Sequence, residues 1–223
     1  DATLRVATPL ILAAMAGIFS ERSGIIDISL EGKMLLAAFV AAAVAYGTGS
    51  PWIGAIAAIF VSVLASLLHG FACITHRGNQ VISGLAINIL ASGLTVTAGI
   101  ALFRKGGQTP TLPKTARFNS IELPFADFFA ENIPILGVIY KELISGHNIL
   151  VWLALVSVGV TYYVLFKTTF GLRLRAVGEK PEALDSAGIS VAKTRYQAVI
   201  IAGVLCGLAG VYLSTATGAG FVK

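Results

Sequence analysis

Four long stretches of this 223-residue chain contain no Asp, Glu, Lys or Arg, and they restrict what it can fold into. They span residues 35–68, 79–103, 148–166 and 196–222. A helix needs about 20 apolar residues to cross a bilayer, so each stretch can hold one span and the first can hold most of two. A β-barrel would show short alternating segments instead. We therefore expect an all-α, polytopic helical integral membrane protein.

The composition supports this fold class and bears on partners. Charged residues make up 12% of the chain and hydrophobic residues 56%, whereas soluble domains carry about 25% charged residues. The chain therefore lacks the polar surface that would cover a globule in water. A net charge of +5 would suggest nucleic acid as a partner for a soluble protein. Here it indicates basic loops in the cytoplasm, so we expect a lipid bilayer and no nucleic acid.

The apolar runs predict about six spans in a single transmembrane domain, residues 1–223. These are Leu4–Phe19, Met34–Tyr46, Trp52–Thr75, Val81–Phe103, Asn148–Phe166 and Tyr196–Ser214. The second is short unless it borrows residues from 25–30, and the sequence leaves open whether 20–33 re-enters the membrane. The stretch ADFFAEN, residues 126–132, predicts a short interfacial helix.

The distribution of Lys and Arg predicts the orientation. Segment 167–195 holds six basic residues against three acidic ones, and short loops rich in Lys and Arg stay in the cytoplasm. We therefore expect a cytoplasmic loop at 167–195 and an extracytoplasmic loop at 104–147, with the N-terminus outside. Residues 20–33 and 76–80 then lie inside, and Lys33 counts among the inner basic residues.

The charged loop contains signals for a short helix. Pro181 suits the first position of a helix, Glu182 suits its positively polarised N-terminus, and Gly188 suits the position just after its end. We predict an isolated helix at Pro181–Ala187, flanked by turns. Two turns are not stable alone in water, so the helix needs a surface to pack against. The alternative is a solvated connecting loop.

One face of the fourth predicted span carries polar and small residues. Asn88, Ser92 and Thr95 are spaced i, i+4 and i+7, Gly84 precedes Asn88 by four, and Ser83 is polar as well. Polar groups inside a membrane are costly and often face a solute path. Small, weakly polar residues are equally common where helices pack together. Both interpretations remain open from the sequence.

The remaining ionisable residues allow few kinds of chemistry. Asp27 and Glu31, with Ser29 between them, can form a proton relay, or Ser29 can start the next helix as its cap. His69 is expected to be an interfacial side chain. The three histidines are too dispersed for a metal site, and no GxxxxGK[ST] phosphate-binding loop occurs. We expect no cofactor, no metal and no enzymatic activity in this chain.

Three stretches resemble the permease subunits of ATP-binding-cassette importers that take up nucleosides with a basic-membrane-lipoprotein-type binding protein. They are SERSGIIDISLEGKMLLAAF (residues 20–39), NQVISGLAINILASGLT (79–95) and VGEKPEALDSAGISVAKTRY (177–196). Such permeases carry a cytoplasmic coupling helix with the pattern Glu-Ala-Ala, three residues, Gly. Here Glu182, Ala183 and Leu184 precede Asp185, Ser186, Ala187 and Gly188, with Leu184 in place of the second Ala.

The resemblance implies a multi-pass permease of a bacterial plasma membrane, in the nucleoside branch of the branched-chain amino acid and sugar permease family. It would translocate nucleosides or a related small polar solute. The implied partners are two ATP-binding subunits, a second permease subunit and an extracytoplasmic solute-binding lipoprotein. Permeases of this family continue through further spans, so the chain looks like the first two-thirds of one. The alternative is a secondary, ion-coupled transporter.

The resemblance also assigns the charged loop a role as the contact with an ATPase, through Pro181–Gly188. Ala183, Leu184 and Ala187 would form the apolar anchor of that contact. Glu182 and Asp185 would lie toward its rim, where charges affect register more than affinity.

Overall fold

The computed structural model describes residues 2–121, 146–217 and 220–222. In this described part, six helices are long and apolar enough to cross a membrane. They are α1 (Ala2–Arg22), α2 (Leu30–Thr48), α3 (Pro51–Gly70), α4 (Gln80–Phe103), α7 (Ile149–Lys167) and α10 (Val191–Val211). Helix α3 continues into the π-helical turn η1 (Phe71–Thr75), and α10 continues into η4 (Tyr212–Thr217). The prediction of an all-α, polytopic membrane protein is confirmed.

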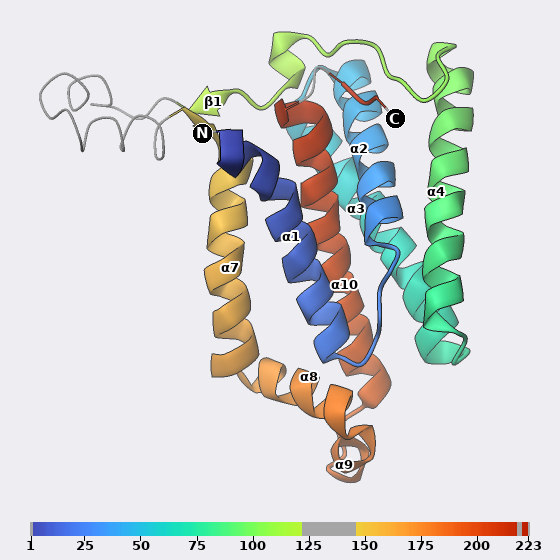
Figure 1. Ribbon diagram of the computed structural model, residues 1–223, viewed down its shortest axis with the longest axis vertical. Helices are drawn as coiled ribbons and strands as arrows, with labels where there is room; N and C mark the ends of the chain where they lie inside the picture. Colours follow the sequence, from blue (N-terminus) through green and yellow to red (C-terminus); the bar gives the residue numbers. More distant parts are fainter. Residues whose placement is uncertain (1, 122–145, 218–219, 223) are drawn as a thin grey trace, which may run out of the picture.

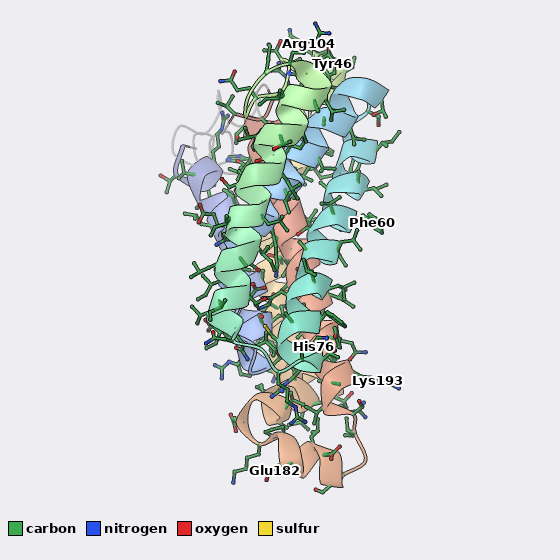
Figure 2. The ribbon with its side chains drawn as sticks, turned by 90° about the vertical axis from the view of Figure 1, so that its right-hand side faces the viewer. Tyr46, Phe60, His76, Arg104, Glu182 and Lys193 are labelled. Atoms are coloured by element: carbon green, nitrogen blue, oxygen red, sulfur yellow. The ribbon has the colours of Figure 1, made fainter. Side chains whose placement is uncertain are left out.

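Successive helices run in opposite directions, so the connections gather at two ends (Figure 1). Tyr46 and Arg104 mark one end, and His76 and Glu182 lie toward the other (Figure 2). We call the end that carries Glu182 the inner end and the opposite one the outer end. The segments predicted to be cytoplasmic all lie at the inner end, as six crossings require. Their orientation relative to a membrane stays a prediction.

The second span is longer than predicted and begins abruptly. Helix α2 starts at Leu30 and ends at Thr48, whereas the sequence suggested Met34–Tyr46. Residues 23–29, which we call the α1–α2 connection, are not helical. Ser23, Ile25, Asp27 and Ser29 are nevertheless buried. The connection therefore folds back among the helices instead of extending into solvent.

Helix α10 lies at the centre of the bundle, and its glycines allow close contact with α3 and α2. A Cβ at Gly207 would lie 2.8 Å from the Ile59 Cα, and one at Gly210 would lie 2.6 Å from the Met34 carbonyl oxygen. The Ser62 hydroxyl donates a hydrogen bond to the Gly203 carbonyl over 2.7 Å. Small residues favour helix association in lipid because they let backbones approach, and this contact follows that rule.

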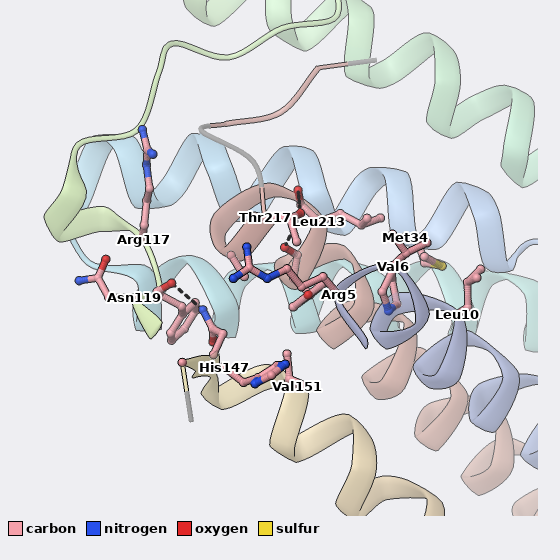
Figure 3. Close-up of a pocket in the computed structure, with 16 residues that line it drawn as sticks. Arg5, Val6, Leu10, Met34, Arg117, Asn119, His147, Val151, Leu213 and Thr217 are labelled. Carbon is pink, nitrogen blue, oxygen red and sulfur yellow. Dashed lines mark hydrogen bonds between the residues drawn. The ribbon is translucent and has the colours of Figure 1, made fainter. Parts of the chain in front are cut away.

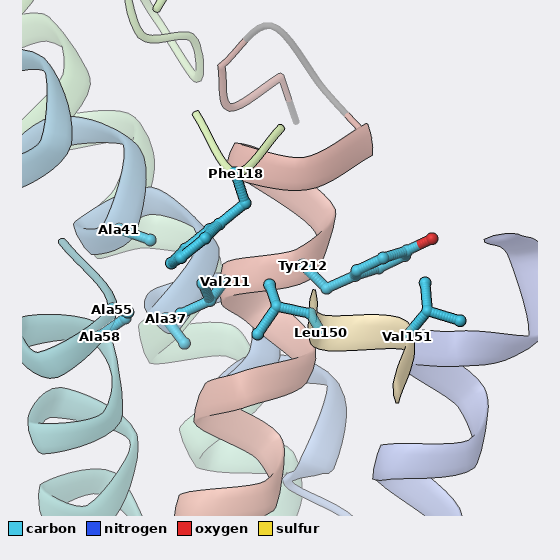
Figure 4. Close-up of a cluster of buried hydrophobic side chains, with 9 residues drawn as sticks. All are labelled: Ala37, Ala41, Ala55, Ala58, Phe118, Leu150, Val151, Val211 and Tyr212. Carbon is cyan, nitrogen blue, oxygen red and sulfur yellow. The ribbon is translucent and has the colours of Figure 1, made fainter. Parts of the chain in front are cut away.

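Small side chains also dominate the core near the outer end. One buried cluster joins α2, α3, α7, α10 and the outer connection (Figure 4). Its members are Ala37, Ala41, Ala55, Ala58, Phe118, Leu150, Val151, Val211 and Tyr212. The large rings of Phe118 and Tyr212 fill the space where the helices diverge, while the alanines let α2 and α3 approach closely.

The outward surface has the reverse composition of a soluble protein. Ile56, Phe60 and Ile89 are exposed, whereas Ser62 and Thr95 are fully buried. A surface of large apolar side chains is stable only in contact with hydrocarbon or another apolar surface. Polar side chains in a membrane protein face the interior, where they find partners. The distribution therefore matches a protein whose solvent is lipid.

The described residues between α4 and α7, 104–121 and 146–148, form the outer connection, and short pairings hold them together. The strands β1 (Ser120–Ile121) and β2 (His147–Asn148) pair antiparallel, and the 3-10 turn η2 (Lys114–Ala116) precedes them. The Thr109 N–H donates to the Phe221 carbonyl over 3.0 Å, which ties residues 220–222 to this connection. The predicted interfacial helix at 126–132 lies outside the described residues.

The charged segment forms two helices, α8 (Thr169–Glu179) and α9 (Pro181–Ser186). The prediction of an isolated helix flanked by turns is therefore wrong on its N-terminal side. The sequence Leu-Arg-Leu-Arg alternates over only four residues, too few to distinguish a strand from a helix. In helix α8, Leu174 and Val177 share one face, and both are fully buried under the bundle. The predicted start of α9 at Pro181 is confirmed.

We expect Gly207→Val to destabilise the bundle by about 1–3 kcal/mol or more, because the new side chain overlaps the α3 backbone. Gly159→Val is the matched control, since a Cβ at Gly159 on α7 meets no atom within 4 Å. Thermal unfolding of the two detergent-purified variants measures the difference. Equal unfolding temperatures would contradict the close α3–α10 contact.

Candidate functional site

The backbone of the α1–α2 connection is held by side chains from neighbouring helices. The Ile26 N–H donates to Gln80 Oε1 over 2.7 Å, and the Gln80 amide lies 3.4 Å from the Gly24 carbonyl oxygen. The Ile26 carbonyl oxygen lies 3.3 Å from His69 Nε2. Polar side chains of α3 and α4 thus bind peptide groups that have no helical partner.

Asn88 makes the same kind of contact farther along. Its Nδ2 donates to the Ile28 carbonyl over 3.1 Å, and its Oδ1 accepts from the Gly32 N–H at 2.8 Å. One side chain of α4 therefore binds both the connection and the first turn of α2. Gly32 is needed for this approach, because a Cβ there would lie 2.6 Å from Asn88 Oδ1.

A buried ion pair lies within the connection. Lys33 is 0% exposed and its ammonium donates to Asp27 Oδ2, while Asp27 is 7% exposed. The Ser29 hydroxyl donates to Asp27 Oδ1 over 2.5 Å. A buried charge is tolerated when it is paired and its remaining lone pairs are hydrogen-bonded, and both conditions hold for the Asp27 carboxylate.

This pair corrects three sequence predictions. Asp27 pairs with Lys33 and not with Glu31, which is exposed in the first turn of α2. Ser29 does precede α2, but its hydroxyl makes no capping hydrogen bond because it binds Asp27. Lys33 is neutralised inside the protein, so it carries no information about orientation.

His69 is also placed differently from the prediction. It is fully buried instead of interfacial. Its Nδ1 lies 3.1 Å from the Ser83 hydroxyl, and its Nε2 lies 3.9 Å from Asp27 Oδ1. The polar cluster at the inner end therefore consists of Asp27, Ser29, Lys33, His69 and Ser83. Sequence spacing could not bring these residues together, because they come from α2, α3, α4 and the connection.

The predicted polar face of α4 is used mainly for packing. Gly84 lies against the connection, where a Cβ would be 3.2 Å from the Ser29 nitrogen. Thr95 is buried and donates to the Ser92 carbonyl over 3.1 Å. The close approach of Gly84 and the bonds of Asn88 and Ser83 fit the interpretation of packing, whereas the Thr95 bond lies within α4. A role for these residues in solute passage stays a prediction.

The predicted coupling residues project from the inner end (Figure 1). Ala183 on α9 and Ala187, the residue just after its end, are exposed, with Glu182 and Asp185 exposed beside them. Leu184 is only 7% exposed, so it holds α9 against this protein and cannot belong to an outward-facing anchor. The anchor predicted from the sequence must therefore be reduced to the two alanines.

Gly188 ends α9 as predicted. Its φ is +76°, a conformation that costs glycine little. Its N–H donates to the Asp185 carbonyl over 2.9 Å, and the Ile189 N–H donates to the Leu184 carbonyl over 3.1 Å. The chain therefore turns sharply toward α10.

At the inner end, α8 and α10 contact the end of α1 and the α1–α2 connection. A Cβ at Gly178, near the end of α8, would lie 2.4 Å from the Arg22 carbonyl oxygen. From α10, Arg195 Nε donates to the Ser23 carbonyl over 3.2 Å. The element that carries α9 thus touches the backbone whose other side is held by Asn88 and His69.

A second candidate region, a cavity of about 810 Å³ at the outer end, was missed by sequence reasoning. Arg5, Arg117, Asn119, His147 and Tyr212 supply polar groups to it, and apolar side chains supply much of the rest (Figure 3). Its volume is in the range of small-molecule sites, roughly 300–1,000 Å³. The one signal in the sequence was Arg5, a charge near the start of an apolar span.

Comparison with known families identifies the chain. A family model described as branched-chain amino acid transport system / permease component matches residues 1–223. The chain belongs to this permease family. No solved structure matches the permease.

Three relatives show what this permease is similar to. It is 41% identical to the guanosine ABC transporter permease protein NupQ of Bacillus subtilis, with 96% of this chain and 66% of the relative covered. It is 35% identical to the nucleoside ABC transporter permease protein NupC of Lactococcus lactis, covering 97% and 70%. It is 34% identical to the putative glucose ABC transporter permease protein TsgC13 of Haloferax volcanii, covering 97% and 62%. The permease thus spans about two thirds of the length of these relatives.

In the permease, we expect Asp27→Asn to be strongly destabilising, by about 3–5 kcal/mol, because it leaves the Lys33 ammonium buried without a counter-charge. The double variant Asp27→Leu with Lys33→Met should recover much of the loss, since it removes both charges. Glu31→Gln, an exposed neighbour, should have little effect. Thermal unfolding in detergent gives the comparison, and a double variant less stable than Asp27→Asn would contradict the pairing.

We also expect Asn88→Leu to lower the yield of folded permease, since the Ile28 carbonyl and the Gly32 N–H both lose a partner. A polar group that is shielded from water and left unmatched costs about 1–3 kcal/mol. Thr97→Val on the exposed side of α4 is the control. If Asn88→Leu folds normally but stops uptake, the packing interpretation is wrong and Asn88 contacts solute.

Proposed function

We propose that this chain is the membrane-spanning subunit of an ATP-driven importer of nucleosides in a bacterial plasma membrane. The observation that carries the proposal is the match of the permease family over residues 1–223, together with relatives named for guanosine and nucleoside transport. The six apolar helices supply the membrane domain that such a subunit needs.

Energy must reach this subunit through a protein contact, because the sequence holds no phosphate-binding loop of the P-loop type. Helix α9 is suited to that contact. It projects from the inner end, Ala183 and the adjoining Ala187 are exposed, and the buried Leu184 packs against the rest of this chain. A short helix fixed in this way can insert into a groove of a soluble partner. We propose that one of two ATP-binding subunits docks here and that the other docks on a second permease subunit.

The further partners follow from the same assignment. A second permease subunit would complete the membrane pathway, and an extracytoplasmic solute-binding lipoprotein would deliver solute to the outer end. The outer cavity, with Arg5, Arg117 and Tyr212, lies where such a delivery would take place. Arginine and tyrosine side chains can hydrogen-bond and stack on a nucleobase, which supports a nucleoside as the solute.

An ion-coupled secondary transporter is the second candidate, and the buried Asp27–Lys33 pair beside His69 favours it. Carriers of that kind use ionisable residues inside the membrane. In this chain the two charges neutralise each other and organise the backbone of the connection. This arrangement supports a structural role for the pair over the movement of protons.

Uptake of labelled guanosine by cells that express the permease with its partner genes tests the proposal. Uptake should require hydrolysable ATP, should persist when the proton gradient is collapsed, and should be blocked by other nucleosides but not by glucose. If uptake stops when only the proton gradient is collapsed and ATP is still present, the result would support the secondary transporter. If glucose competes and nucleosides do not, the proposed solute would be wrong, whereas the ATP-driven mechanism would still stand.

The proposed contact predicts the effect of changes on α9. Ala183→Arg and Ala187→Arg should each weaken copurification with the ATP-binding subunits by about tenfold, which corresponds to about 1.4 kcal/mol. The cause is the burial of a new, unpaired charge in the interface. Lys114→Arg at the outer end is the control, and normal ATPase copurification by both alanine variants would show that α9 is only a linker.

A further inference from the structure

An apolar groove of about 380 Å³ lies at the inner end, between the C-terminal parts of α1 and α7. Met15 and Ile18 line it from α1, and Val158, Leu165 and Phe166 line it from α7. Val158 and Phe166 are exposed at the outer surface of the bundle. The groove therefore opens outward, toward the hydrocarbon that surrounds a membrane protein.

Cationic residues lie at or near the inner end of this groove. Arg22 lines it, and the Arg175 guanidinium lies 5.0 Å from the centre of the Phe166 ring. Arg175 Nε is buried and has no hydrogen-bond partner in the described part of the chain. Lys167 follows Phe166 in sequence and is exposed. The carboxylate of Glu21 also lines the groove, so three cations lie near one anion.

We propose that this groove binds one anionic phospholipid. An acyl chain would lie along Ile18, Val158 and Leu165, where only apolar atoms are needed. The headgroup phosphate would accept hydrogen bonds from the guanidinium groups of Arg175 and Arg22. Basic pockets between membrane helices recognise anionic headgroups in this way, and guanidinium–phosphate hydrogen bonds are short and strong.

The geometry distinguishes this site from a general attraction between basic loops and lipid. Arg173 lies on the same helix as Arg175 and is exposed. Two residues along a helix are about 200° apart around its axis, so the two side chains point in nearly opposite directions. A specific site should depend on Arg175 and not on Arg173, although both carry the same charge.

The test uses the complete permease purified in detergent, with phosphatidylglycerol and phosphatidylcholine of identical acyl chains as probes. Native mass spectrometry should show phosphatidylglycerol bound about tenfold more tightly, as expected for one charge-assisted hydrogen bond. Phosphatidylglycerol should also raise the unfolding temperature. Inorganic phosphate at the same concentration should do neither, because it has no acyl chain.

Two kinds of variant distinguish the contribution of the lipid headgroup from that of the acyl chain. Arg175→Gln and Arg22→Gln should each remove the preference for phosphatidylglycerol and the rise in unfolding temperature, while Arg173→Gln should retain both. Val158→Trp, placed in the groove, should weaken binding of both lipids. Val158 is partly exposed, so the larger side chain can be accommodated without disturbing the core.

Three results would overturn the proposal. The first is equal binding of both lipids by the unaltered protein. The second is an equal effect of Arg173→Gln and Arg175→Gln, which would indicate diffuse charge attraction. The third is a crosslink from a cysteine at Val158 to another membrane helix, which would show that protein and not lipid fills the groove.

Discussion

Hydrocarbon supplies no hydrogen bonds, so any non-helical backbone inside a membrane domain must find its partners in the protein. Much of this structure is arranged around that requirement at residues 23–29. Gln80, Asn88, His69 and Arg195 bind peptide groups of this segment. Asn88, which the sequence made a candidate for a solute path, is therefore also one of the side chains that hold this non-helical backbone.

The same requirement explains where charge is found. The long helices present large apolar side chains outward and small or weakly polar ones inward, so charges concentrate at the two ends or are paired within the bundle. The Asp27–Lys33 pair is the paired case. Helix α9 lies at the inner end, where the proposed ATP-binding subunit would bind. The cavity lies at the outer end, where the proposed solute would bind.

Contacts at the inner end link α9 to the α1–α2 connection and, through it, to α4. Helix α8 packs under the bundle through Leu174 and Val177 and carries α9. Its Gly178 touches the end of α1, and Arg195 at the start of α10 holds Ser23. A force applied at α9 under the proposed function would act on the backbone that Asn88 joins to α4. This is a physical reason for the connection to be held by so many side chains.

The sequence by itself determined the fold class, the six spans, the start of α9 and the turn at Gly188. These features depend on the length of apolar runs, on the residues that favour helix ends and on the conformational freedom of glycine. All three are properties of short segments. It misplaced Lys33, His69 and Leu184 because each looked like a surface or terminal residue in its own segment. Only the tertiary structure decided their roles, since burial and ion pairing depend on which helices pack together. Asp27 meets Lys33 and His69 because the connection folds back against α3 and α4, where His69 and Asn88 bind its carbonyl groups from positions far away in the chain.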